Sequence, residues 1–350
     1  KIVYEQYYGI ANRSKGLPLS EQASVQLASV SKTFTAAAVL YLYQHKYLDI
    51  NDLVSTYIPS FPYKNINIKM LLNHRSGLPD YTHWAVPYAN KSKRIFYNDD
   101  IIKLLASVKP RLDFPSNTHF KYSNTNYALL GHIISKVTGI PYQQYIKKNI
   151  LEPLDMKNTY WEYDSVPKEQ LVKGYRWEDD QWKPEPILHD GAYGSMGGLI
   201  TSIEDFSKYV GFHLSAWPPR NDEETGPVRR SSLREMQQPK FSNLYAKATD
   251  FKGDSCAVIS GYGYGLGIAK YCNGLIRVSH GGALPGYGSN YVFFPEYGIG
   301  IMAFCNLTYT TPWPFEEIGK LLFETVKLEP RKLPVSDILM ERKDQVTQLI

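Results

Sequence analysis

Two residues near the start of the chain have the types and spacing of an activated serine. Ser29 and Lys32 form an S-x-x-K tetrad, followed by the apolar run Ala36–Tyr43. Positions i and i+3 share one face of a helix, so Lys32 can reach the Ser29 hydroxyl. A serine becomes a good nucleophile when a base takes its proton, and a lysine can be that base when burial lowers its pKa. The tetrad predicts nucleophilic catalysis, with a helix-capping serine as the alternative.

The same tetrad pattern occurs a second time, at Ser165 and Lys168. That match lies in a polar stretch with no apolar helix behind it, so nothing there would bury the lysine and lower its pKa. We expect Ser165 and Lys168 to lie on the surface.

Tyr122 and Asn124 form a Y-x-N triplet at the start of a strongly apolar helical segment. A tyrosine hydroxyl can pass a proton between a serine, a lysine and a leaving group. An asparagine side chain offers both a donor and an acceptor to a substrate amide. A simple capping turn is the alternative, and the same pattern occurs at Tyr63–Asn65, Tyr88–Asn90 and Tyr271–Asn273.

His280, Gly281 and Gly282 follow the apolar run Leu275–Ser279. Two glycines after a histidine allow the backbone to come close to a ligand. The histidine could offer a ring nitrogen to a carboxylate or a hydroxyl, or it could simply lie in a turn. A rival H-x-G triplet begins at His189, but no strand precedes it.

The elements that must position these residues follow from the apolar pattern. We expect a strand over residues 1–8, and then a long buried helix that ends before Asp49. The next helix runs from Ser123 to Gly139, with a cap candidate at one end and glycine at the other. Strands are expected over residues 262–268, 275–279, 289–294 and 299–305, and Pro314 begins a closing helix.

This order predicts an α/β (α+β) fold, in which an antiparallel β-sheet is flanked by helices and carries an inserted, mainly helical region. The sheet domain would be discontinuous and comprise residues 1–60 and 190–328. The helical region would comprise residues 61–189, and residues 329–350 would form a polar tail.

Composition excludes several classes of protein. The chain has 350 residues, 43% of them hydrophobic, and its net charge is 39 − 34 = +5. The charges are mixed in sign, without the basic patch that nucleic-acid binding needs. The longest apolar run has eight residues, which is too short to cross a bilayer. No histidine pair has the H-x-x-x-H spacing of a metal site, so we expect no metal and no cofactor.

The three cysteines, Cys256, Cys272 and Cys305, show no C-x-x-C spacing. We expect Cys305 to be a buried thiol, whereas Cys256 and Cys272 could pair in an exported protein; the sequence leaves that pairing open. The chain starts at Lys1 without methionine or a signal-peptide pattern. We expect a trimmed N-terminus and a bacterial periplasmic or secreted protein whose export signal is not part of this chain.

Taken in this order, the three motifs resemble the signature elements of the penicillin-recognising serine hydrolases: S-x-x-K, Y-x-N, and K-T-G or its H-x-G variant. The forms found here are similar to the branch that contains class C β-lactamases, DD-peptidases and esterases. Residues 71–81 resemble that branch's "LLTHTSGLPDY" stretch, residues 197–205 its "GGLxSTAxDL" segment, and residues 286–306 its closing strand pair. The resemblance spans most of the chain and implies a β-lactamase/transpeptidase-like fold.

The resemblance also implies a role for each motif residue. Ser29 would be the acylated nucleophile, and Lys32 and Tyr122 would share the general-base and general-acid work. Asn124 would position the substrate amide, and His280 would take the place of the third-motif lysine. The oxyanion hole would consist of the backbone N–H of Ser29 and that of Ala283, just past Gly281 and Gly282, and these two glycines would also line the substrate site.

Two departures from the family pattern bear on the substrate. A histidine at position 280 carries no assured positive charge at neutral pH, and Gly281 stands where a threonine is usual. Both changes weaken recognition of a substrate carboxylate, so a peptidase, amidase or esterase is favoured over an efficient β-lactamase. Trp84, in the loop 81–87, would contact an apolar substrate group, with loop packing as the alternative.

We therefore expect a serine hydrolase that acts through an acyl-enzyme on an amide or ester of a small molecule or peptide. The alternative is a non-catalytic peptide- or cell-wall-binding protein on the same fold. Neither a nucleic-acid partner nor a transmembrane segment is expected, and the sequence leaves the oligomeric state open.

Overall fold

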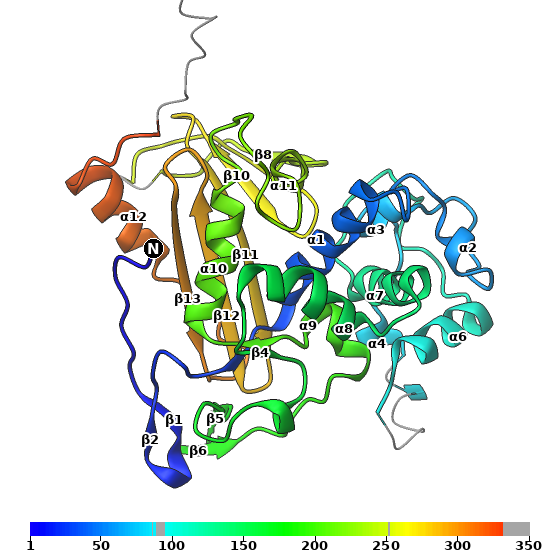
Figure 1. Ribbon diagram of the computed structural model, residues 1–350, viewed down its shortest axis with the longest axis horizontal. Coiled ribbons are helices and arrows are strands. Elements are labelled where there is room, and N and C mark those ends of the chain that lie inside the picture. The colour runs from blue at the N-terminus through cyan, green and yellow to red at the C-terminus, as the bar shows by residue number, and fades with distance from the viewer. Residues whose placement is uncertain (86, 89–94, 251–252, 332–350) are drawn as a thin grey trace, which may run out of the picture.

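A six-stranded antiparallel sheet lies on one side of the molecule and a group of helices on the other (Figure 1). The computed structural model describes residues 1–85, 87–88, 95–250 and 253–331. The strand order in the large sheet is β13-β12-β11-β10-β9-β8. Its strands are β8 Ser242–Tyr245, β9 Val258–Tyr262, β10 Gly267–Tyr271, β11 Ile276–Leu284, β12 Tyr287–Phe294 and β13 Ile299–Cys305.

Burial along β11 alternates with the period of two that a strand imposes. Val278, His280, Gly282 and Leu284 are buried, while the residues between them are half-buried. The neighbouring strand β12 is buried at every position, because helices and loops cover both of its faces. The imidazole of His280 therefore points to the more deeply covered face of the sheet.

Strand β11 is paired over a longer stretch with β12 than with β10. It pairs with β12 along its course as far as Leu284, but its pairing with β10 ends at Ser279. Past Ser279, the side of β11 that faced β10 is open to another part of the molecule. This open side turns toward the start of helix α1.

The helices differ greatly in length, and most of the longer ones surround α1. Along the chain they are α1 Ser31–Gln44, α2 Val54–Tyr57, α3 Ile68–Leu72, α4 Tyr81–Trp84, α6 Asn98–Val108, α7 Asn124–Thr138, α8 Tyr142–Ile146, α9 Gly194–Gly197, α10 Ile203–Leu214, α11 Arg230–Met236 and α12 Phe315–Lys320. Helix α10 lies over the sheet, and α2, α3, α6 and α7 gather on the far side of α1 (Figure 1). No helix in the described ranges is long and apolar enough to span a membrane.

Helix α1 is the centre of the core. Every residue from Ser31 to Leu40 is buried, and so is Leu42. This helix is apolar on nearly all sides, as expected for one enclosed between a sheet and other helices. Its residues belong to one large apolar cluster that also contains residues of α7, α10 and the sheet.

Three small antiparallel sheets complete the fold. They pair β1 Ile10–Asn12 with β2 Leu17–Pro18, β3 Val25–Gln26 and β4 Thr159–Tyr160 with β7 Ile200–Thr201, and β5 Tyr175–Glu178 with β6 Gln181–Pro184. Strand β3 ends three residues before Ser29, so its pairing in the β3–β7–β4 sheet fixes the backbone that leads to Ser29.

The predicted fold class is confirmed, as are the helix before Gly139 and the closing helix after Pro314. The strand expected over residues 1–8 is wrong, because that segment has no pairing partner and its side chains are largely exposed. The strand over 262–268 is wrong in its middle: Gly263 donates its N–H to the Leu266 carbonyl, and Gly265, at φ +71°, turns the chain.

The structure also answers the question about the cysteines. Cys256 and Cys272 form a disulfide that joins the segment before β9 to the end of β10. Cys305 is half-buried rather than fully buried, and its thiol donates to the Thr310 carbonyl.

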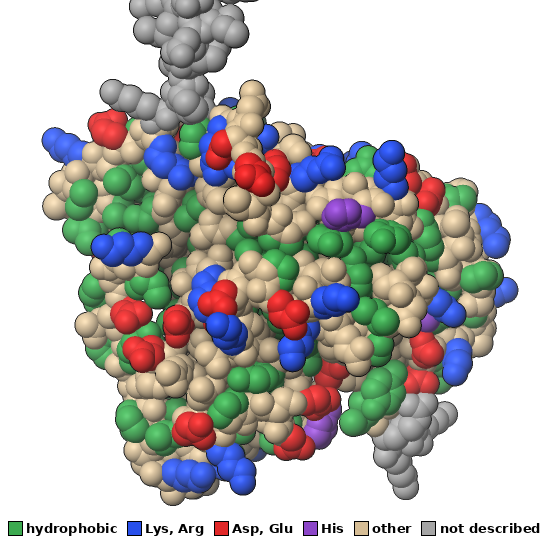
Figure 2. Space-filling model, in the orientation of Figure 1, with side chains coloured by type: hydrophobic (Ala, Val, Ile, Leu, Met, Phe, Trp, Pro, Cys, Tyr) green, Lys and Arg blue, Asp and Glu red, His purple; other side chains and the backbone are tan. Residues whose placement is uncertain are grey.

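The division into residues 1–60 with 190–328 and residues 61–189 stays a prediction; strands β4, β5 and β6 lie within the segment expected to be mainly helical. Asn90 of a rival Y-x-N match, Val86 of the loop 81–87 and most of the tail, residues 332–350, lie outside the described residues. On the face drawn in Figure 2, basic and acidic side chains are interspersed, as the mixed charge pattern indicates.

Candidate active site

Ser29 lies in a short 3₁₀ turn, Ala28–Val30, that runs directly into α1. The residue before it, Ala28, has a positive φ of 52° and is fully buried. Such a conformation is unfavourable for a residue with a Cβ and persists only where the surroundings enforce it. The sharp turn places the Ser29 side chain at the N-terminal end of α1, where it is half-buried rather than enclosed.

The Lys32 ammonium lies one helical turn further, 3.0 Å from the Ser29 hydroxyl oxygen. Lys32 is fully buried, and Nζ donates a second hydrogen bond of 2.6 Å to the Met196 carbonyl of α9. Burial lowers the pKa of Lys32 to about 7, and the negative charge of Asp80 opposes this shift. Near neutral pH a large fraction of Lys32 is therefore an amine that can accept a proton from Ser29.

Tyr122 covers the other side of this lysine. Its ring centroid is 5.0 Å from Lys32 Nζ, and its hydroxyl is buried without a hydrogen bond of regular geometry. Burial raises the pKa of Tyr122, and an interaction with the Ser29 hydroxyl only partly offsets the rise. Tyr122 is consequently a protonated phenol at neutral pH, suited to donating a proton.

His280 is held by hydrogen bonds at both ring nitrogens. Nδ1 donates to the Gly281 carbonyl at 2.7 Å, so Nε2 of the neutral ring accepts from the Tyr262 hydroxyl at 3.0 Å. Burial, together with the nearby charge of Lys32, lowers the pKa of His280 to about 3. This histidine therefore contributes no positive charge at neutral pH.

Gly282 brings β11 against the turn that carries Ser29. A Cβ at this position would lie 2.3 Å from the Leu27 carbonyl oxygen and 2.9 Å from the Ala28 Cβ. Ser289 of β12 donates a hydrogen bond of 2.6 Å to the same Leu27 carbonyl. Only glycine permits this approach, which sets the open edge of β11, including Ala283, beside Ser29.

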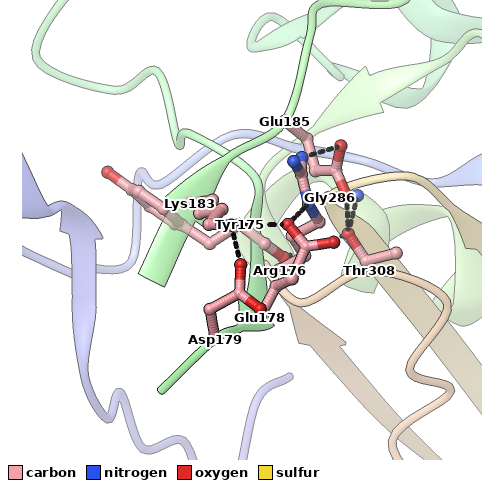
Figure 3. Close-up of polar contacts among 8 residues, drawn as sticks. All are labelled: Tyr175, Arg176, Glu178, Asp179, Lys183, Glu185, Gly286 and Thr308. Carbon is pink, nitrogen blue, oxygen red and sulfur yellow. Dashed lines mark hydrogen bonds and ion pairs between the residues drawn. The ribbon is translucent and has the colours of Figure 1, made fainter. Parts of the chain in front are cut away.

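The turn that follows Ala283 is braced from outside by the β5–β6 hairpin (Figure 3). The Gly286 N–H donates to the Thr308 hydroxyl at 2.8 Å, and that hydroxyl donates to Glu185 at 2.6 Å. Arg176 pairs with Glu185 at 3.1 Å. These contacts fix the end of β11 and hence the position of its open edge.

Asn124 lies at the first position of α7, two residues after Tyr122. Its side-chain Nδ2 donates to Asp80 Oδ2 at 2.9 Å, and its backbone N–H donates to the same oxygen at 3.0 Å. The side-chain oxygen of Asn124 is buried and has no hydrogen-bond partner among the described residues. The Nδ2 end of the Asn124 amide is therefore fixed by Asp80, while its Oδ1 atom accepts no hydrogen bond from the described residues.

Trp84 has a packing role. Its side chain is half-buried against the main apolar cluster, and its indole N–H donates to the Pro79 carbonyl at 3.2 Å. A contact with substrate stays a prediction for this residue. In the second S-x-x-K match, Ser165 and Lys168 are both exposed on the surface, as expected.

Several residues at the site were not singled out from the sequence. Met196 supplies the carbonyl that orients Lys32, Asp80 holds Asn124, and Tyr262 holds His280. His74 is fully buried, with its ring centroid 4.3 Å from that of Tyr122. Asp80 and His74 lie in the stretch 71–81 that resembles the family pattern, so that stretch was the available signal.

Similarity to known proteins identifies the family of this chain. The β-lactamase family profile matches residues 1–321. The chain belongs to the β-lactamase family. Penicillin-binding protein 4* of Bacillus subtilis (strain 168) is 39% identical over 159 residues, which are 45% of this chain and 35% of that protein. The matched region of this chain thus covers about a third of that relative's own length.

Solved structures show the same fold. An octameric penicillin-binding protein homologue from Pyrococcus abyssi has a TM-score of 0.77 and 25% identity, with 100% of this chain and 75% of that chain covered. A class C β-lactamase has a TM-score of 0.69 and 18% identity, covering 93% of this chain and 88% of the other. The expected family is confirmed by the profile match and by the similarity to a penicillin-binding protein, and the class C β-lactamase shares the fold.

Proposed function

We propose that this β-lactamase-family chain is a serine hydrolase that forms an acyl-enzyme at Ser29 from an amide or ester. The observation that carries the proposal is the contact between Lys32 Nζ and Ser29 Oγ at 3.0 Å, with burial lowering the pKa of that lysine to about 7. A base with a pKa near the operating pH is the most effective proton acceptor.

The reaction has two halves. Ser29 Oγ bonds to the carbonyl carbon while its proton passes to the Lys32 amine, and the N–H groups of Ser29 and Ala283 bind the oxyanion. Tyr122, a protonated phenol in the resting site, donates a proton to the departing amine or alcohol as its bond to carbon breaks, and is reprotonated from Lys32. Water then attacks the acyl ester and gives a proton to the Lys32 amine. As the bond between the acyl carbon and Ser29 Oγ breaks, Tyr122 donates a proton to Oγ and is reprotonated from Lys32, which releases the acid and restores the Ser29 hydroxyl.

The neutral state of His280 bears on the substrate class. Its Nε2 accepts from Tyr262 and its Nδ1 donates to a backbone carbonyl, so the ring offers no charge to a substrate carboxylate. The geometry thus favours a DD-peptidase-like, amidase or esterase reaction over efficient hydrolysis of β-lactams, whose carboxylate would lack that partner.

We also propose that the protein is exported. The disulfide between Cys256 and Cys272 supports this location, because such bonds persist in oxidising compartments. The similarity to penicillin-binding proteins supports it too. A small molecule or a peptide is the proposed substrate, and the oligomeric state is left open.

Labelling with a fluorophosphonate probe tests the proposal. We expect one adduct by intact mass, located on Ser29 by peptide mapping, and none in Ser29→Ala. Ser165→Ala is the matched control, because it removes the serine of the exposed second tetrad and should label normally. Circular dichroism and thermal melting establish that each variant is folded.

The alternative, a peptide- or cell-wall-binding protein on the same fold, predicts a different result. A folded wild-type chain that takes up no probe, and that hydrolyses neither D-alanyl peptides nor simple esters, would overturn the hydrolase proposal. An adduct at another serine would overturn the assignment of Ser29.

A further inference from the structure

We propose that Asp80 sets the substrate class by fixing the Asn124 amide, so that the site selects acyl donors with a protonated amine beside the scissile carbonyl. This inference rests on the proposed function and deepens it. It concerns a residue that touches neither Ser29 nor Lys32, and Asp80 is therefore treated as a positioning and specificity-determining residue.

The Asp80 carboxylate is held by four hydrogen bonds. Oδ1 accepts from the backbone N–H and the hydroxyl of Thr82, at 3.0 and 2.8 Å. Oδ2 accepts from the backbone N–H and the side-chain Nδ2 of Asn124, at 3.0 and 2.9 Å. This group precedes α4 as its N-cap and binds the first residue of α7, so it joins two elements at the edge of the site.

The carboxylate decides which way round the Asn124 amide lies. A carboxylate accepts hydrogen bonds and repels an amide oxygen, so Nδ2 must face Asp80 and Oδ1 must face away. Asn124 Oδ1 is buried with no hydrogen-bond partner among the described residues. A buried acceptor without a partner is unfavourable, and a substrate N–H would satisfy it.

The charges around this acceptor favour a cation. The negative charge of Asp80 is felt by Lys32, Tyr122 and Tyr193: burial is the main cause of each pKa shift, and Asp80 opposes the lowering at Lys32 and adds to the rise at the two tyrosines. Burial keeps the two histidines that face this region, His280 and His74, neutral by lowering the pKa of both. Among the groups named here Lys32 is the remaining cation, and burial, by lowering its pKa to about 7, leaves about half of it uncharged at pH 7.

The expected substrate therefore carries an ammonium group rather than a carboxylate near the scissile bond. An α-amino group has a pKa near 7.7–8.0, so it is largely protonated at pH 7.0 and can donate to Asn124 Oδ1. Its positive charge would also be attracted by Asp80. An N-acylated substrate would lose the charge, and a succinylated one would bring a repelled carboxylate.

Matched substrates test this. Alanine p-nitroanilide, its N-acetyl derivative and its N-succinyl derivative are compared at pH 7.0, each in both enantiomers. We expect wild-type kcat/KM for the better enantiomer to be at least about tenfold higher with the free amine than with the acetyl group, as a charge-assisted hydrogen bond implies. The succinyl derivative should be the poorest of the three.

Asp80→Asn should reduce the free-amine preference by about tenfold, because it removes the charge and lets the Asn124 amide rotate. Asp80→Glu should retain the preference, and Asp113→Asn is the matched control. Asp113 pairs with Lys121 at 2.8 Å and does not bind Asn124. If turnover is too slow, protection of Ser29 from the fluorophosphonate by alaninamide and by N-acetylalaninamide gives the same comparison.

The outcomes separate the two proposals. Absence of probe labelling in folded wild-type protein counts against the hydrolase function itself. Normal labelling with an equal or greater rate on the acetylated substrate would overturn the role of Asp80. An equal loss on all three substrates in Asp80→Asn would also overturn it, because that result indicates only a structural contact.

Discussion

Replacement of Lys32 by methionine gives a test of the site that does not depend on knowing the substrate. Lys32 is fully buried, and burial lowers its pKa from 10.5 to about 7. Between these two pH values the unfolded chain binds a proton that the native protein does not, so the free energy of unfolding rises with pH. In Lys32→Met this contribution is absent at every pH.

The size of the effect follows from the two pKa values. Between pH 7 and pH 8.5 the lysine should contribute about 1.7 kcal/mol of increasing stability to the wild type. Asp190, whose pKa burial raises to about 7, acts in the opposite direction as pH rises toward 7 and loses its influence above it. Its contribution cancels when the wild type and Lys32→Met are compared at each pH.

Urea denaturation followed by tryptophan fluorescence at pH 7.0, 7.5, 8.0 and 8.5 measures this difference. The Cys305 thiol, whose pKa burial raises, contributes equally to the wild type and to Lys32→Met, so its contribution also cancels in this comparison. Lys168→Met is the control, because Lys168 is exposed and should not change the profile.

A wild-type minus Lys32→Met difference that stays constant over this range would refute the reasoning. It would mean that the Lys32 pKa is not lowered by burial, and the assignment of this lysine as the base would lose its physical basis.

Three further predictions concern the residues around Ser29. Tyr122→Phe should slow acylation of Ser29 by about 10²–10⁴-fold without unfolding the protein, since it removes the proton donor; a burst experiment with a chromogenic ester measures the rate, and an unchanged rate would contradict the role. His280→Lys should lower KM for a carboxylate substrate relative to its methyl ester, because it introduces a cation; equal KM changes would exclude this. Gly282→Ala should abolish probe labelling, because a Cβ would lie 2.3 Å from the Leu27 carbonyl oxygen; Gly211→Ala, which meets open space, should label normally.

The motifs could be found from the sequence because each one depends on local spacing. The i, i+3 relation of Ser29 and Lys32 predicted a contact that the structure places at 3.0 Å. The apolar period and the terminal Gly139 predicted α7, where Gly139 has a φ of +73° and ends the helix.

The partners of the motif residues were not predictable in the same way. The Met196 carbonyl reaches Lys32 from 164 positions away, and any residue type could supply a backbone oxygen. Tyr262 was assigned to a strand without a role, and its bond to His280 depends on how β9, β10 and β11 lie side by side. The strand expected over residues 1–8 failed because apolar residues form a strand only when a neighbouring strand accepts their hydrogen bonds.

The distances along the chain that this site spans have a consequence for how the protein matures. Ser289 bonds to the Leu27 carbonyl across 262 positions, and Lys32 depends on a carbonyl 164 positions later. Contacts between such remote segments form slowly, because closing the long intervening loops costs entropy before the contacts can stabilise the structure. Ser29 is therefore an ordinary, unreactive serine throughout synthesis and early folding, and its reactivity appears only with the completed tertiary structure. The labelling rate of Ser29 would then report the final step of folding, and a chain that stalls midway would have no active nucleophile.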